Sequence, residues 1–177
     1  NADLYKEINL SREDEFYIDD EHRKLGHVVL IGALEMLRWF HDNGFELHFF
    51  SAAAKERNEK IVPWLLTLAF GEPLVSEIHT KAKILSKSHL SPKNGAMAKD
   101  LSKITHDWDS PDVEIVLIDD DETYTASEKQ FLRYLHVPSI KHCEYEIDFA
   151  LKRPPRNKLL LAMGVMIQAF SAYKSSP

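Results

Sequence analysis

Four positions in the chain carry side chains that together could handle a phosphate group. In chain order they are Ser51, directly after the apolar stretch "FELHFF"; Lys99, in "GAMAKDLSKI"; and Asp119 with Asp120, directly after "VEIVLI". A hydroxyl at a strand end, followed by open backbone amides such as that of Ala52, can hold a phosphate oxygen. A lysine neutralises phosphate charge, and a carboxylate pair prefers a hard cation such as Mg²⁺. Together they predict a phosphoryl-transfer site.

Each of these features also has an ordinary structural explanation. A serine after a strand is commonly a turn or N-cap residue, and a single lysine such as Lys99 is commonly solvated. An Asp-rich turn at the start of a helix is a frequent surface feature. The order and spacing of the four features, and not any one of them, favours the functional interpretation.

Composition and length limit the class of protein. The chain has 177 residues, which suits one domain, with 22 basic against 28 acidic residues and a formal net charge of −6. The absence of a basic patch argues against nucleic acid as a partner. A single cysteine, Cys143, excludes a disulfide framework and fits a reducing compartment, so a cytoplasmic location is expected. The longest apolar run, from Leu159, is shorter than the ~20 residues of a membrane-spanning helix.

The pattern of apolar residues predicts alternating strands and helices. The runs "EFYIDD" and "GHVVLIG" predict a β-hairpin, and "ALEMLRWFHDNG" predicts a helix that stops at Gly44. After the strand "FELHFF" comes a predicted helix that Pro63 could kink or divide. We expect a short strand at "PLVSEIHT", a turn at Asn94-Gly95 followed by the start of a helix, and a helix at "ASEKQFLRYLH". An extended run at "PSIKHCEY" and a C-terminal helix over about 157–173 complete the prediction.

This alternation predicts an α/β domain with a mostly parallel central sheet. In such sheets ligands bind at the carboxyl ends of the strands. Ser51 and Asp119 both follow strands directly, so both are expected at that edge.

The order strand–Ser, Lys, strand–Asp-Asp resembles motifs II, III and IV of the haloacid dehalogenase (HAD) superfamily. The likeness is to its small-capped, Asp-dependent protein phosphatases of the CTD-phosphatase type, and it covers about residues 28 to 125. The phrases that carry it are "ALEMLRWFHDNGFELHFFSAAAKERNEKIVPWL" and "SKSHLSPKNGAMAKDLSKI". The resemblance implies a three-layer, Rossmann-like domain over 1–177 with a small hairpin insert at about 12–31. It also implies that Ser51 and Ala52 bind phosphate, that Lys99 stabilises the phospho-enzyme, and that Asp119 and Asp120 hold Mg²⁺.

One motif of the family is missing from this chain. The family's first motif, an apolar strand ending Asp-x-Asp-x-Thr/Val, precedes the others and supplies the nucleophile and the general acid/base. Before Ser51, only Asp19 and Glu21 in "FYIDDEH" come near it, and the third position lacks an aspartate. We therefore expect the nucleophile strand upstream of residue 1. A phosphatase-like protein without a nucleophile is the alternative.

A literal Asp-x-Asp-x-Thr occurs only at Asp119, Asp121 and Thr123. If this were the nucleophile motif, a second Ser/Thr strand, a lysine and an acidic metal motif should follow it, and the sequence offers no clear set. Ser51 and Lys99 would then have no role. The metal-ligand interpretation is favoured for this reason.

The resemblance implies a Mg²⁺-dependent phosphatase that forms an aspartyl-phosphate. The small insert suggests an open site, which favours a phosphoprotein over a small phosphomonoester as the substrate. Similar enzymes act on phosphoserine or phosphotyrosine, and some are delivered by bacteria into the host-cell cytosol. The alternative function is a catalytically inactive HAD-like module that binds a protein or a phospho-ligand. Oligomeric state and substrate identity are not indicated by the sequence.

Other phosphate chemistries do not fit the spacing. After Cys143 of "HCEYEIDF" and five intervening residues, a cysteine phosphatase needs arginine, but this chain has Phe149. The nine histidines form no His-x-x-x-His pair, and there is no Gly-x-x-x-x-Gly-Lys nucleotide loop.

Overall fold

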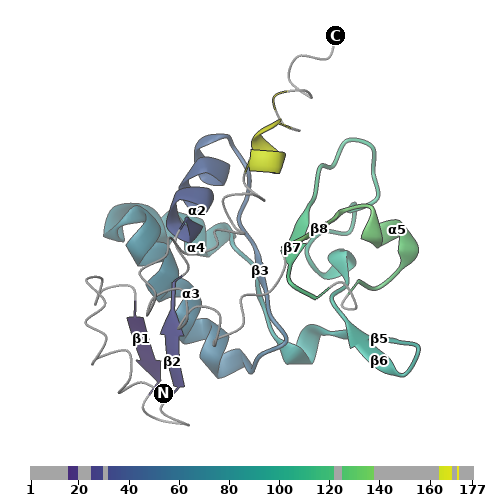
Figure 1. The fold of residues 1–177 in the computed structure, drawn as a ribbon, viewed down its shortest axis with the longest axis horizontal. Helices are drawn as coiled ribbons and strands as arrows, with labels where there is room; N and C mark the ends of the chain where they lie inside the picture. Colours follow the sequence, from purple (N-terminus) through teal and green to yellow (C-terminus); the bar gives the residue numbers. More distant parts are fainter. Residues whose placement is uncertain are drawn as a thin grey trace, which may run out of the picture.

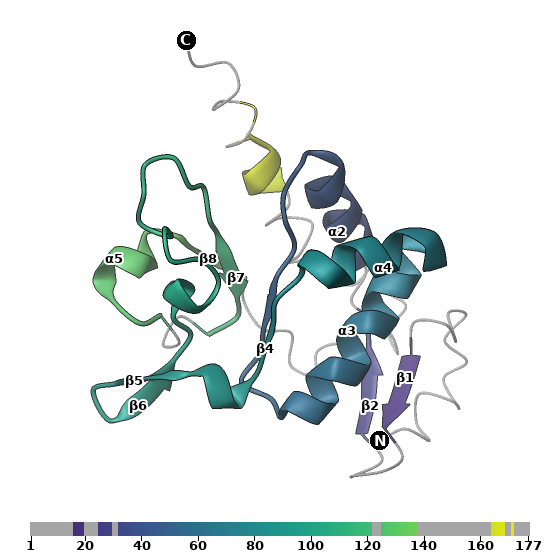
Figure 2. The same ribbon diagram turned by 180° about the vertical axis from the view of Figure 1, so that it is seen from behind.

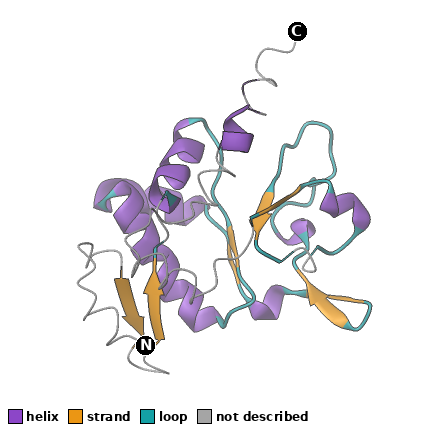
Figure 3. Cartoon of the chain, viewed as in Figure 1, coloured by secondary structure: helices purple, strands orange, loops and turns teal. Residues whose placement is uncertain are grey.

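The structure, a computed structural model, describes residues 16–19, 25–29, 32–121, 125–137, 164–168 and 171. Short helices and strands alternate along these residues (Figures 1 and 3). The strands are β1 (Phe16–Asp19), β2 (Leu25–Val28), β3 (Phe49–Phe50), β4 (Ile84–Leu85), β5 (Ser91–Lys93), β6 (Ala96–Ala98), β7 (Leu117–Asp119) and β8 (Tyr134–His136). The α-helices are α2 (Ala33–Asp42), α3 (Lys55–Phe70), α4 (Glu72–Lys81) and α5 (Glu128–Phe131), with 3₁₀ turns η2 (Lys87–His89) and η3 (Leu101–Lys103).

The described strands form four two-stranded sheets. β1–β2 and β5–β6 are antiparallel hairpins, whereas β3–β4 and β7–β8 are parallel pairs. The predicted α/β class is therefore confirmed at the level of a mixed α/β fold. Within the described residues no strand joins the two parallel pairs into one sheet, so the three-layer Rossmann-like arrangement remains a prediction.

The two parallel pairs lie at the centre of the molecule. In Figures 1 and 2, helices α2, α3 and α4 lie on one side of β3–β4, and the part with β7, β8 and α5 lies on the other. The β1–β2 hairpin forms where two β-rich runs predict one, and it lies beside α3 in both views. This layout puts the Ser51 strand and the Asp119 strand in neighbouring parts of the fold.

Helix α2 forms as its sequence predicts. Leu34, Leu37 and Phe40 recur at helical spacing and are buried. The helix ends at Asp42, and Gly44 follows with a positive φ of 83° that glycine adopts without strain.

Helix α3 runs from Lys55 to Phe70 through Pro63, so of the two expected effects of this proline, a kink or a division, the division does not occur. Val62 and Leu66 on its buried face pack with Ile78 of α4. Arg38 of α2 binds the C-terminal end of α3, where its Nε donates to the carbonyl of Ala69 over 2.6 Å. Packing along the whole face outweighs the one backbone hydrogen bond that proline cannot donate.

The stretch predicted as a strand at "PLVSEIHT" is a helix, α4, and that prediction was wrong. Gly71, at φ 71°, separates α4 from α3, and a proline stands in the first turn, where its missing N–H is not needed. Leu74 and Ile78 are four residues apart and pack with Leu66 of α3. Contact with the neighbouring helix thus decides between helix and strand for a short apolar run.

The turn predicted at Asn94-Gly95 is confirmed as the tip of the β5–β6 hairpin. Both residues have positive φ, 47° and 79°, as a tight two-residue hairpin turn requires. After this turn a helix was expected to start, but the structure has β6 and then only a single 3₁₀ turn, η3. Its N-cap is Asp100, whose side chain accepts a hydrogen bond from the amide of Ser102.

The helix predicted at "ASEKQFLRYLH" is too long. Helix α5 ends at Phe131, and Tyr134–His136 forms β8. The reason is pairing with β7: Leu117 N donates to Arg133 O over 2.8 Å, and Val137 N donates to Asp119 O over 2.8 Å. The run "PSIKHCEY" lies outside the described residues, as does most of the predicted C-terminal helix, of which 164–168 and 171 are helical.

The buried core lies mainly between α2, α3, α4 and the β3–β4 pair. Two clusters share Leu47, Phe49 and Phe70 at their edges, and Leu66 is 0% exposed. In the part of the chain that the structure describes, no helix is long and apolar enough to cross a bilayer.

Candidate functional site

Two of the predicted site residues are in direct contact. Asp119 is the last residue of β7, and Lys99 follows β6 directly. The Lys99 ammonium donates to Oδ2 of Asp119, although the residues are 20 positions apart in the chain. Their side chains are 7% and 6% exposed. A lysine with a solvated side chain, the ordinary alternative for Lys99, is therefore excluded.

The second oxygen of Asp119 organises the acidic turn. Oδ1 accepts hydrogen bonds from the backbone amides of Asp120, over 2.9 Å, and Asp121, over 3.2 Å. Asp120 is exposed, and its carbonyl lies 3.2 Å from Nε2 of His136 at the end of β8. The three consecutive carboxylates thus differ in surroundings, with Asp119 buried and Asp120 facing solvent.

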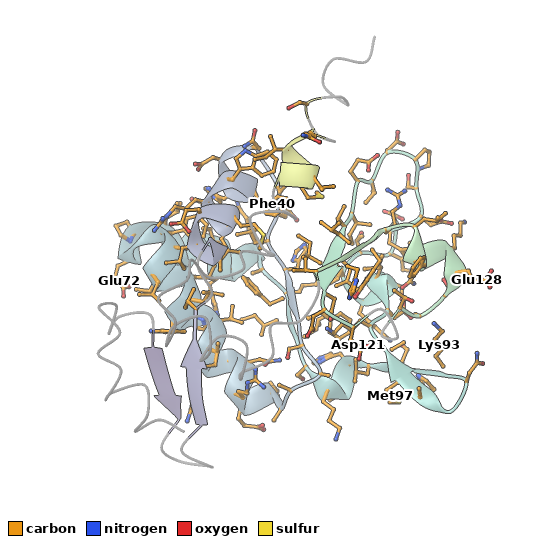
Figure 4. All side chains as sticks on the ribbon, viewed as in Figure 1. Phe40, Glu72, Lys93, Met97, Asp121 and Glu128 are labelled. Carbon is orange, nitrogen blue, oxygen red and sulfur yellow. The ribbon has the colours of Figure 1, made fainter. Side chains whose placement is uncertain are left out.

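Lys99 is held in place by contacts with residues that lie far along the chain. It forms a parallel bridge with Thr125, and the ammonium of Lys93 in β5 donates to the carbonyl of the same threonine. The following residue, Asp100, accepts a hydrogen bond from Nε2 of Gln130 over 2.9 Å. In Figure 4, Asp121 is drawn near the β5–β6 hairpin, whose Lys93 and Met97 are labelled.

Ser51 lies at the carboxyl end of the other parallel pair. It follows β3 directly, its amide donates to Leu85 O over 3.1 Å, and its Oγ accepts from the amide of Ala53 over 3.2 Å. Ser51 and Ala52 are both half-buried, and the first turn of α3 begins after Ala54, which provides no side-chain cap. The hydroxyl therefore lies in a turn that leads into a helix N-terminus, as a phosphate-binding serine requires.

The end of β4 is fixed against α3. Asn58, buried at 5% exposure, donates from Nδ2 to Leu85 O over 3.0 Å, and the amide of Lys87 donates to Ala53 O over 2.9 Å. These bonds fix the turn that carries Ser51. Sequence analysis did not single out Asn58, because one asparagine inside a helix is not a recognisable signal.

Ser86, Ser88 and His89 form a polar cluster after β4 that looks like a nucleophile and its base. Nδ1 of His89 lies 3.1 Å from Oγ of Ser86. However, the same nitrogen accepts a hydrogen bond from the backbone amide of Ser86 over 3.0 Å, and Ser86 is 1% exposed. Ser86 and His89 therefore cap η2, and the buried hydroxyl of Ser86 is out of reach of a substrate.

The acidic turn suits a hard cation by donor chemistry. Carboxylate oxygens of Asp119 and Asp120 are ligands that Mg²⁺ prefers, and it commonly completes its shell with water and substrate oxygens. Within the described residues no group of three or more His, Cys, Asp or Glu side chains is arranged to hold a metal by itself. Oδ2 of Asp119 is the oxygen that Lys99 contacts.

The remaining sequence candidates contribute little to this site. Thr123, Glu21 and Cys143 lie outside the described residues, and Asp19 ends β1 in the hairpin beside α3. Sequence analysis also missed Gln130, buried at 6% exposure, which binds the segment after Lys99. The sequence offers an N-cap residue at Asp100, which indicates where η3 begins, but no local signal for the distant Gln130.

Comparisons with known proteins do not add to the geometry. No protein-family model matches the chain, and no curated protein matches it.

Proposed function

We propose that the chain belongs to a Mg²⁺-dependent phosphatase of the HAD type, which hydrolyses phosphomonoesters through an aspartyl-phosphate. The observation that carries the proposal is the buried contact between Lys99 and Asp119. Two residues selected from the sequence for phosphate chemistry, from separate segments, meet at the carboxyl end of a parallel strand. Positive charge beside a strand-end carboxylate suits a site that must accept a phosphate dianion.

The two parallel pairs support the same arrangement. Ser51 follows β3 and Asp119 ends β7, so each pair has a predicted site residue at its carboxyl end. A strand inserted between β3–β4 and β7–β8 would join them into the one parallel sheet that a Rossmann-like domain has. The proposal places the nucleophile motif on such a strand, and no motif of that kind is identified in this chain.

The reaction follows from these roles. A carboxylate of the nucleophile motif attacks phosphorus, the P–O ester bond breaks, and a second aspartate protonates the leaving oxygen. That aspartate then takes a proton from water, whose oxygen attacks phosphorus and releases phosphate and the free carboxylate. Mg²⁺, which Asp119 and Asp120 would hold, would supply charge neutralisation. Ser51 and the amides after it orient a phosphate oxygen, and Lys99 stabilises the negative charge of the phospho-enzyme.

The substrate class proposed is a phosphoprotein carrying phosphoserine, phosphothreonine or phosphotyrosine. Support comes from the small hairpin β1–β2, which spans only residues 16–28 in the segment where the resemblance places the cap. A small cap leaves the site open to a macromolecule. A bulky cap would restrict the site to small phosphomonoesters.

The experiment is hydrolysis of an aryl phosphate by the encoded protein, with and without MgCl₂, beside the 177-residue chain alone. We expect Mg²⁺-dependent turnover by the encoded protein, reduced about 10²-fold or more by Lys99→Ala. Lys129→Ala, which removes an exposed lysine from an ion pair with Asp109, is the matched control and should change little. Activity of the isolated chain would make Asp119 and Asp121 the nucleophile pair. Inactivity of both would favour the phospho-ligand-binding module.

A further inference from the structure

Both carboxylate oxygens of Asp119 have protein partners in this fold. Its Oδ2 is bound by the Lys99 ammonium, and its Oδ1 accepts the amides of Asp120 and Asp121. Both side chains of the ion pair are less than a tenth exposed. A buried carboxylate of this kind needs a counter-charge, and Lys99 supplies it.

A divalent cation at Asp119 would need the oxygen that Lys99 occupies. Mg²⁺ binds carboxylate oxygens at about 2.0–2.1 Å in a strict octahedral shell. An ammonium cannot share the lone pair that Mg²⁺ takes, and on the other lone pair of Oδ2 it would lie directly beside the cation. The ammonium and the cation also repel each other, and this repulsion is strong where both are shielded from water. The two positive groups are therefore alternatives at Oδ2.

We propose that Lys99 is the internal counter-ion of Asp119 and competes with the divalent cation for Oδ2. Cation binding displaces the ammonium, and the released Lys99 is then available to a phosphate group. The Oδ1 hydrogen bonds to Asp120 and Asp121 need not change, so the turn keeps its shape during the exchange. The inference rests on the proposed function for the identity of the cation site.

This exchange has a thermodynamic consequence. Breaking the ion pair costs free energy that is subtracted from the cation's own binding energy, so the intact chain binds Mg²⁺ more weakly than its carboxylates allow. Removing the lysine charge removes that competition. Lys99→Met keeps an unbranched side chain of similar length in the buried position while it deletes the charge.

The experiment is calorimetric titration of the folded chain with MgCl₂ at mildly alkaline pH. We expect Lys99→Met to bind Mg²⁺ at least about tenfold more tightly than the parent, which is about 1.4 kcal/mol. Lys99→Arg, which keeps the charge, should show no tightening. Adding Asp119→Asn to Lys99→Met should abolish the gain, which places the cation at Asp119.

Lys129→Met is the matched control for net charge. It also removes one lysine from an ion pair, but that pair is exposed, with side chains 65% and 43% exposed. Equal tightening by Lys129→Met and Lys99→Met would mean a general charge effect and would overturn the inference. Unchanged affinity in Lys99→Met, or no binding by either protein, would overturn it too.

A second measurement covers the case in which Lys99→Met does not fold. In the parent chain, the reactivity of Lys99 toward an amine-acylating reagent, followed by mass spectrometry, should rise with MgCl₂ while that of Lys129 stays constant. No rise in Lys99 reactivity contradicts the exchange. Neither readout needs turnover, so tighter Mg²⁺ binding by Lys99→Met, together with no turnover by the encoded protein, would preserve the inference and reject the phosphatase. Turnover by the encoded protein without tighter Mg²⁺ binding by Lys99→Met would support the phosphatase and overturn the inference.

Discussion

The side-chain amide of Gln130 bonds to Asp100 across 30 positions of the chain, with Nε2 2.9 Å from Oδ1 of the carboxylate. Its Oε1 accepts the amide of Leu101 over 3.0 Å, so both ends of the buried amide are engaged. Gln130 belongs to α5, and Lys99 directly precedes the residues it binds. The amide therefore ties the segment after Lys99 to the part of the fold that follows β7.

Replacing Gln130 with leucine should destabilise the protein. Gln130→Leu keeps the size of the side chain. It leaves the buried amide of Leu101 without its acceptor and the carboxylate of Asp100 without this donor. We expect a loss of about 1–3 kcal/mol in the free energy of unfolding, measured by urea denaturation. Glu128→Leu, at an exposed position of the same helix, is the control and should stay within about 0.5 kcal/mol. Equal small losses would show that the Gln130 amide contributes nothing specific.

Asp100 should make the same region sensitive to acid. Burial alone would raise the pKa of Asp100, but hydrogen bonds from Gln130, Ser102 and Ser91 outweigh it and hold the pKa below 3.8. A lowered pKa means stability that is present above pH 3.8 and is lost as pH falls through the folded value. The difference in unfolding free energy between the parent and Asp100→Asn should therefore shrink as pH falls below 3.8. A constant difference would contradict this.

Leu66 lies fully buried in the core. It is 0% exposed and packs with Val62 of its own helix and Ile78 of α4. Leu66→Ala should cost about 2–5 kcal/mol, because the lost transfer energy and the cavity add. Leu132→Ala, the same substitution at 83% exposure, should cost less than about 0.5 kcal/mol. Unfolding by urea measures both, and similar losses at the two positions would refute the assigned core.

Local pattern predicted some elements of this fold, and contacts between elements decided the others. The spacing of Leu34, Leu37 and Phe40 identifies α2, because one helix face alone explains it. The α4 sequence suits a strand or a helix, and packing against α3 selects the helix. Likewise the segment Tyr134–His136 continues a helical pattern, and only pairing with β7 makes it a strand.

The candidate site shows the same division. Residue type and order selected Lys99 and Asp119, and the structure brings them together. The sequence could not show that both side chains are buried, nor that Gln130 holds the segment beside them. Burial and a bond over 30 positions depend on the whole fold, and no local spacing encodes them.

The β5–β6 turn should depend on its glycine. Gly95 has φ 79° and no atom within 4 Å of the position of an added Cβ, so strain alone sets the cost of a side chain there. Gly95→Ala should therefore destabilise by about 1–2 kcal/mol, as expected for an L residue with positive φ. Asn94→Gly is the control, since Asn94 also has positive φ, at 47°, and should be neutral or stabilising. Thermal unfolding measures both, and equal melting temperatures for Gly95→Ala and the parent would contradict the turn geometry.

His48 should make stability depend on pH near neutrality. Nδ1 of His48 accepts the amide of Lys83 over 3.1 Å, just before β3 and β4 pair. Burial lowers its pKa below 6.5, and Lys83 adds to this, although Glu46 acts in the opposite direction. The unfolded chain therefore binds the proton first, so stability is complete above pH 6.5 and falls as pH drops through that value toward the folded pKa. His48→Asn retains an acceptor for Lys83 and should weaken this dependence, as urea unfolding across this pH range would show. If the parent and the variant lose stability in parallel below pH 6.5, other groups are responsible and the pKa of His48 is not lowered.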